Sequence, residues 1–157
     1  MNIHDKHYRT IWPSGDAVEV IDQTKLPHEF VTLRLNSAKD CAVAIKTMVV
    51  RGAPLIGATA AYGMALAMRE DASDTGLDRA HDMLLETRPT AINLHWALKR
   101  MRDLLRNQPR EARAALAWKE AGAICDEDVA VCRSIGEHGL NIFREAAAKK
   151  KPGEPLN

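Results

Sequence analysis

Hydrophobic and polar positions alternate in only one part of the chain, between residues 18 and 35. Residues 18–21 form a short β-branched segment, and residues 30–35 alternate apolar with polar side chains until their end. Such alternation is typical of strands that bury one face. Residues 22–27 between them have a turn-forming composition, and residues 12–16 predict a break before the first strand. We therefore expect a small antiparallel sheet of two or three strands.

After residue 36 the apolar residues recur at spacings of three and four, which is typical of amphipathic helices. Ser37 is expected to cap the first helix, with Asp40 in its first turn, and this helix should stop near Val50. Pro54 suits the first position of a second helix over residues 54–69. Because that helix is rich in glycine and alanine, we expect the backbone of another element to approach it closely.

Three further helical segments are predicted downstream. A short helix should cover residues 77–86, and Pro89 should assist the start of an amphipathic helix that ends at residues 107–109. Residues 111–148 are helical again, as one helix or as two. Four positions of this segment are expected to lie in the core: Ile124, Val131, Ile135 and Ile142. Two tryptophans, Trp96 and Trp118, are also expected to fill the helical core.

The pattern predicts a mainly α fold with a small N-terminal antiparallel β-sheet, which is an α+β class. We expect residues 1–36 to form the sheet and residues 37–148 a helical bundle. Two prolines and a glycine in residues 149–157 are typical of a linker. With 157 residues, 46% of them hydrophobic and 27% charged, the chain has the size and composition of one globular domain.

Charge and hydropathy exclude several classes of partner. The 22 lysines and arginines and 21 aspartates and glutamates leave a net charge of +1. This balance gives no global electrostatic reason to expect a nucleic acid or an anionic membrane surface. The chain lacks both the roughly 20-residue apolar run of a membrane span and the apolar core of a secretory signal. We therefore expect a cytoplasmic protein.

The sequence contains no evident catalytic or metal-binding group. Cys41, Cys125 and Cys132 are an odd number without CxxC spacing, so neither a disulfide framework nor a zinc site is expected. Asp22 and Glu86 could serve as acids, but no partner carboxylate lies near either in the sequence. The histidines show no metal-ligand spacing; they are His4, His7, His28, His81, His95 and His138.

Two segments nevertheless have the composition of an anion-binding site. Arg51 and Gly52 precede the helix start at Pro54, where unpaired N–H groups and the helix dipole favour an anion. Arg88 stands just before a second helix start, with threonine hydroxyls beside it. If the two starts converge, they would grip a phosphate. The alternative is that both segments are ordinary structural breaks between helices.

The order of these segments resembles one family. The segments are Asp22-Gln23-Thr24-Lys25-Leu26-Pro27, Met48-Val49-Val50-Arg51-Gly52-Ala53-Pro54-Leu55-Ile56-Gly57, Thr87-Arg88-Pro89-Thr90-Ala91-Ile92-Asn93-Leu94 and Ile135-Gly136-Glu137-His138-Gly139. They are similar to S-methyl-5-thioribose-1-phosphate isomerases, aldose–ketose isomerases of methionine salvage related to the regulatory subunits of translation initiation factor 2B. The resemblance runs from about residue 8 to the last residue. Leu55 departs from it, because many relatives carry alanine there.

The resemblance implies a substrate clamp made of Arg51, Gly52, Ala53 and Arg88. It implies conversion of S-methyl-5-thio-α-D-ribose 1-phosphate to S-methyl-5-thio-D-ribulose 1-phosphate, without a cofactor or metal, by an enzyme that is a homodimer at full length. Its expected catalytic cysteine and aspartate lie beyond Asn157, in a Rossmann-like C-terminal domain that is absent here. Neither Cys125 nor Cys132 matches that cysteine's motif. The chain is therefore expected to be an N-terminal portion that is inactive alone.

Two alternative functions remain open at this point. Ribose 1,5-bisphosphate isomerase would share the clamp, and a noncatalytic helical interaction module like the initiation-factor relatives would serve protein contact instead. The segment at residues 22–27 favours the methylthioribose-1-phosphate isomerase.

Overall fold

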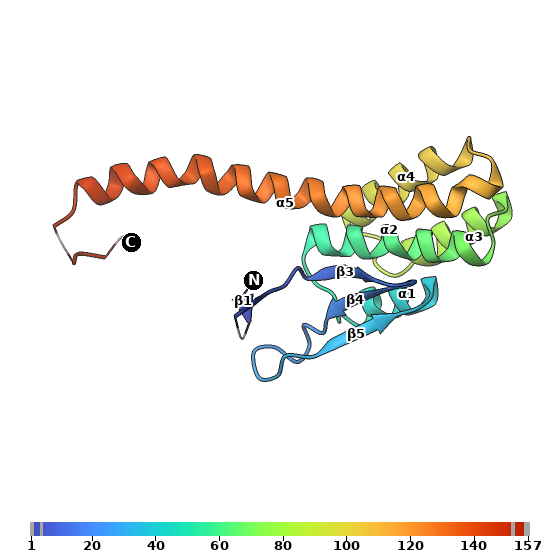
Figure 1. The fold of residues 1–157 in the computed structure, drawn as a ribbon, viewed down its shortest axis with the longest axis horizontal. Helices are drawn as coiled ribbons and strands as arrows, with labels where there is room; N and C mark the ends of the chain where they lie inside the picture. Colours follow the sequence, from blue (N-terminus) through green and yellow to red (C-terminus); the bar gives the residue numbers. More distant parts are fainter. Residues whose placement is uncertain (1, 4, 152, 156–157) are drawn as a thin grey trace. The chain divides into compact units, whose positions relative to one another are not determined.

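The computed structural model describes residues 2–3, 5–151 and 153–155. By their packing they divide into two compact units, Met1–Ile124 and Cys125–Asn157. In the first unit, strands give way to helices between Leu35 and Ala38 (Figure 1). The expected α+β class, mainly helical with a small N-terminal antiparallel sheet, is confirmed. The proposed boundaries after residues 36 and 148 remain predictions.

The main sheet has three antiparallel strands in the order β3-β4-β5. They are β3 (Ile11–Ser14), β4 (Ala17–Ile21) and β5 (Thr32–Leu35). The break expected at residues 12–16 is partly wrong, because Trp12, Pro13 and Ser14 pair with β4 and only Gly15 and Asp16 form the turn. Proline fits here since β3 is an edge strand, where a missing N–H costs no ladder bond. A two-residue pair that the pattern did not predict, β1 (Asn2–Ile3) with β2 (Lys6–His7), precedes this sheet.

Helix α1 (Ala38–Lys46) begins as predicted, with a complete capping box at Ser37 and Asp40. The Asp40 amide donates to the Ser37 hydroxyl at 3.1 Å, and the Ser37 amide donates to the Asp40 carboxylate at 3.0 Å. The helix ends four residues earlier than expected. Met48 has a positive φ of 63°, so the backbone leaves the helical region there.

Helix α2 (Ala53–Glu70) is the centre of the first unit (Figure 1). Every residue from Leu55 to Met68 is buried, since the helix contacts α1, α3 (Asp74–Leu85) and α4 (Ile92–Arg106). A helix that is apolar all round is stable only under such cover. The close approach expected from its small residues is confirmed at Gly57, where an added Cβ would lie 2.9 Å from the Asn93 carbonyl oxygen.

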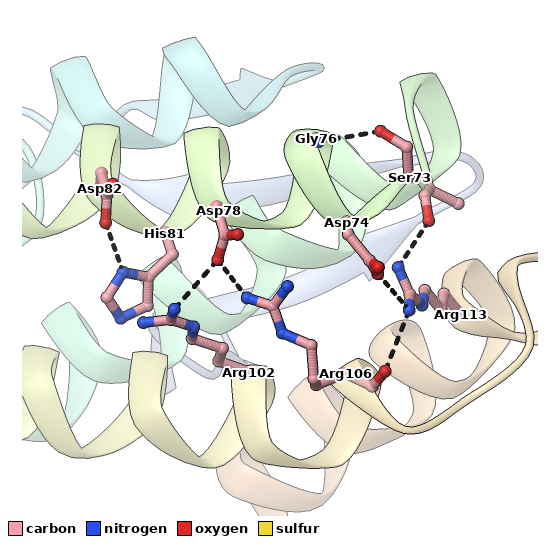
Figure 2. A network of polar contacts seen from close by, with 10 residues as sticks. Ser73, Asp74, Gly76, Asp78, His81, Asp82, Arg102, Arg106 and Arg113 are labelled. Atoms are coloured by element: carbon pink, nitrogen blue, oxygen red, sulfur yellow. Dashed lines mark hydrogen bonds and ion pairs between the residues drawn. The ribbon is translucent and has the colours of Figure 1, made fainter.

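Ion pairs join the polar faces of α3 and α4 and the start of α5 (Arg110–Ala148), as Figure 2 shows. Asp78 pairs with both Arg102 and Arg106. Arg113 is only 4% exposed and pairs with Asp74 at 2.7 Å. The same guanidinium donates to three backbone carbonyls, those of Ala72, Arg106 and Gln108. One side chain therefore connects the ends of three helices.

Several expected core positions are exposed. Ile124 is buried, but Val131, Ile135 and Ile142 are 56%, 66% and 70% exposed. Trp96 is 48% exposed and lies against the Arg100 guanidinium, whereas Trp118 is half-buried against Tyr62. The periodicity identified the apolar face of residues 125–148 but could not show whether this chain covers it. Of the expected linker, Pro152, Leu156 and Asn157 lie outside the described residues, as does His4 of the histidines considered above.

Candidate functional site: two adjacent helix starts

The start of α2 is open to solvent and presents backbone N–H groups. Gly52 is its N-cap, with φ 96° and ψ 133°, and no side chain caps the helix. That positive φ favours glycine over any residue with a Cβ. Arg51, Gly52, Ala53 and Pro54 are all exposed. The first turn therefore keeps donors without intrahelical acceptors at the positive end of the helix dipole.

Arg51 is held beside this start by the loop that follows β4. Its Nη2 donates to the Gln23 carbonyl at 3.1 Å, and the Gln23 amide donates to the Val49 carbonyl at 2.9 Å. The bond uses one of five guanidinium donors. In the described part of the chain Arg51 makes no other hydrogen bond that the structure records, so the remaining donors are available to a ligand.

Asp22 shapes that loop rather than acting as a free acid. It is buried, and its Oδ1 accepts from the Thr24 amide at 2.9 Å and from the Thr24 hydroxyl at 2.6 Å. This local pattern is an Asx-type turn, which fixes the backbone two residues on. The carboxylate therefore positions the Gln23 carbonyl that receives Arg51. Glu86, the second acid considered above, is the exposed C-cap of α3.

The segment before α4 is a turn that contains Pro89. Pro89 was expected to assist the helix start itself, but the helix begins three residues later. The Ala91 amide donates to the Arg88 carbonyl at 3.0 Å, and α4 begins only at Ile92. Proline suits the second position of such a turn because its φ is already set. His95 braces it, since its Nε2 lies 2.6 Å from the Pro89 carbonyl oxygen and must donate to it. Arg88 is half-buried at the first position of this turn.

The first turns of α2 and α4 lie side by side. Gly57, one turn into α2, faces the backbone of Asn93 and the Cβ of Ala97. The two segments that carry arginine therefore approach the same end of this helix pair. This arrangement brings Arg51, Gly52 and Ala53 to one helix start and Arg88 to the turn before the other. Their role in binding substrate remains a prediction, to which we return below.

Cys41 offers no activated thiol to these helix starts. Cys41 is fully buried in α1, and burial together with the charge of Asp40 raises the pKa of its thiol far above the ordinary value. A thiol of that kind is a packing group rather than a nucleophile. Cys125 is also buried, and Cys132 is exposed. Among the described residues, no three histidine, cysteine or acidic side chains are grouped as metal ligands.

Sequence pattern alone found part of this site. It identified both arginines and the glycine, but it missed the Gln23 carbonyl and His95, which act through contacts formed by the fold. His95 stands three residues into α4 and six after Pro89, a spacing that could have indicated a brace.

No helix in the part of the chain that the structure describes has the length and apolar character needed to cross a bilayer.

The sequence of these helices places the chain in a known class. The chain belongs to the initiation factor 2 subunit family, whose model matches residues 49–148. The match includes both helix starts.

The individual relatives are more specific. The methylthioribose-1-phosphate isomerase of Methylorubrum extorquens is 64% identical over 152 residues, which are 96% of this chain and 42% of that protein. The resemblance drawn from the sequence motifs is thereby confirmed. The chain spans less than half the length of this relative.

Two solved structures share the fold. The 5-methylthioribose 1-phosphate isomerase of Pyrococcus horikoshii OT3 matches with a TM-score of 0.73 and 39% identity, over 79% of this chain and 37% of that one. The translation initiation factor eIF-2B subunit delta of A. fulgidus matches with a TM-score of 0.71 and 38% identity, over 78% of this chain and 38% of that one.

Proposed function

We propose that this chain forms the phosphate-binding part of a methylthioribose-1-phosphate isomerase that acts in methionine salvage. The observation that carries the proposal is the adjacency of two helix starts, one beside Arg51 and one following Arg88. The 64% identity to a relative of that name supports the choice of substrate. Its partner is then a small sugar phosphate, and the complete enzyme is expected to be a homodimer.

The clamp would act by holding the ester phosphate while the sugar reacts. Because C1 carries a phosphate ester, the ring is not a free hemiacetal and must be opened before hydrogen moves from C2 to C1. Isomerisation needs no external oxidant, since C1 is reduced as C2 is oxidised. Fixed amide and guanidinium donors would bind the dianion and orient the sugar without taking part in that transfer. We expect the catalytic cysteine and aspartate to lie outside the four clamp residues, which are Arg51, Gly52, Ala53 and Arg88.

Phosphate binding tests the clamp directly. In an NMR titration of the isotope-labelled chain, inorganic phosphate should shift the amide resonances of Gly52 and Ala53, because these N–H groups lie at the proposed site. Arg88→Ala should weaken the titration. Arg79→Ala is the matched control, since Arg79 is an exposed arginine on α3 that pairs with Asp71. Shifts confined to other residues would contradict the clamp.

A chimera tests the reaction. This chain should replace the matching 42% of the Methylorubrum extorquens relative, and the chimera should isomerise methylthioribose 1-phosphate. The 157-residue chain alone should show no turnover. If a folded chimera binds phosphate but lacks activity, the phosphate clamp would be supported and methylthioribose 1-phosphate would be refuted as the substrate.

A noncatalytic interaction module is the second candidate. The structural match to eIF-2B subunit delta favours it, because that protein is named as a translation initiation factor subunit. Such a module should bind a protein partner and show no phosphate titration at Gly52. The two candidates therefore differ in the same experiment.

A further inference from the structure

The place of the Arg88 guanidinium is set by the backbone of the turn that carries it. Among the residues that the structure describes, this guanidinium has no hydrogen-bond or ion-pair partner. No neighbouring side chain therefore fixes its direction or its reach. Whatever holds the backbone on either side of Arg88 decides where the five guanidinium donors can go.

Two side-chain hydrogen bonds hold that backbone, one on each side of Arg88. Before it, the Thr87 hydroxyl donates to the Leu84 carbonyl near the end of α3 at 2.6 Å. After it, the His95 Nε2 donates to the Pro89 carbonyl at 2.6 Å. Arg88 is thus suspended between the last turn of α3 and the first turn of α4.

His95 projects from a part of α4 that is firmly held in the core. Its own amide donates to the Ala91 carbonyl at 3.2 Å, and its neighbours Leu94 and Ala97 are fully buried. The imidazole itself is exposed, so the core does not need it for packing. Ala91, the N-cap of α4, makes no side-chain capping bond. The imidazole is therefore the side chain that ties the turn to the helix, and its contribution is one of position rather than of buried surface.

We propose that His95 is a positioning residue for phosphate binding, which acts by fixing the turn that presents Arg88. This inference rests on the proposed phosphate clamp. The neutral imidazole with its hydrogen on Nε2 and the protonated imidazole can both donate to a carbonyl. The bond needs a donor at this place and not a positive charge, so an uncharged donor should replace the histidine.

Replacing His95 tests the need for a donor. In the phosphate titration followed at the Gly52 and Ala53 amides, His95→Leu should raise the dissociation constant about threefold to tenfold, the factor that one hydrogen bond contributes. His95→Gln should restore most of the affinity, because its amide can donate from nearly the same place. His138→Leu is the matched control, since His138 is an exposed histidine whose Nδ1 lies 2.7 Å from the Ser134 carbonyl oxygen. This control should titrate like the unmodified chain.

Thermal unfolding of the same variants separates position from stability. Because the His95 imidazole is exposed, His95→Leu should keep a melting temperature close to that of the unmodified chain. A loss of affinity that accompanies a lower melting temperature, and that glutamine does not restore, would show a structural role and overturn the proposal.

A double variant tests whether His95 acts through Arg88. In an Arg88→Ala background, His95→Leu should cause no further loss of phosphate affinity, because the group that it positions is gone. Additive losses would show that His95 acts on the anion by another route and would overturn the proposal. If Arg88→Ala weakens binding but His95→Leu does not, this inference fails and the clamp stands. If Arg88→Ala changes nothing, the clamp and this inference fail together.

Discussion

Gly57 tests whether the two helix starts are in fact pressed together. In Gly57→Ala the new Cβ would lie 2.9 Å from the Asn93 carbonyl oxygen and 3.4 Å from the Ala97 Cβ. The nearer atom belongs to the backbone of α4, so relief requires the helices to move apart rather than a side chain to rotate. Overpacking of this kind costs about 1–3 kcal/mol.

A control separates this clash from the helix propensity of the residue. Replacing a helical glycine by alanine gains up to about 1 kcal/mol by itself. At Gly122 the same substitution would place the Cβ 3.9 Å from the Tyr62 hydroxyl, an ordinary contact. Gly122→Ala should therefore stabilise the protein, and Gly57→Ala should lie about 1–3 kcal/mol below it. Phosphate affinity should fall in Gly57→Ala alone, because only that change separates the helix starts.

Urea unfolding followed by tryptophan fluorescence measures the difference. All three tryptophans, Trp12, Trp96 and Trp118, belong to the unit that contains both glycines. The slope of free energy against urea should be equal in the two variants, so that their midpoints can be compared. If Gly57→Ala proves as stable as Gly122→Ala, the close contact between α2 and α4 is wrong, and with it the geometry of the clamp.

The remaining predictions concern binding, acid stability and packing. In the active chimera, Arg88→Ala should raise KM by a factor that corresponds to about 1.5–3 kcal/mol and leave the melting temperature unchanged. The KM of Arg88→Lys should lie between those of the unmodified chimera and Arg88→Ala. Unaltered steady-state kinetics would refute the role of Arg88 in binding phosphate. Arg113→Met should destabilise the fold by about 2–4 kcal/mol in urea, because three carbonyls lose a buried donor; a loss below experimental error would contradict it. Ser37→Ala should cost about 1 kcal/mol, measured in the same way, through the lost capping bond. The Arg106 guanidinium holds the pKa of Asp78 below its usual range, so this carboxylate stabilises the fold above its unfolded pKa, and the contribution is lost as pH falls through the lower, folded value. Asp78→Asn should therefore flatten the decline in melting temperature below about pH 4, and an unchanged acid profile would show that the pair contributes nothing.

Local pattern predicted most elements of the fold because their signals are local. The Ser37 cap, the small-residue helix and the alternating strand are each determined by neighbouring residues. The errors in the predicted elements arise at residues whose local signal fits two different structures. Pro13 indicated a break, but an edge strand tolerates it, and Pro89 indicated a helix start, but a turn uses the same φ. At Ile135 and Ile142 periodicity identified an apolar face, while burial depends on what covers that face.

The candidate site was predictable in its charges and glycines but not in its supports. Arg51, Gly52 and Arg88 stand at helix breaks that the sequence displays directly. The Gln23 carbonyl is 28 residues from Arg51, and nothing in either segment specifies their meeting. Only the docking of the strand-following loop against the helices brings the two together.

If an anion binds at the start of α2 as proposed, the Arg51–Gln23 bond would make its binding a reporter of tertiary assembly. The loop after β4 and the segment before α2 form this hydrogen bond only when the sheet is docked against the helices. An anion bound there would therefore draw part of its affinity from that docking. By mass action such an anion would shift the equilibrium toward the docked form, by an amount set by its concentration relative to its dissociation constant. Hydrogen exchange at the amides of the sheet would then slow as phosphate is added.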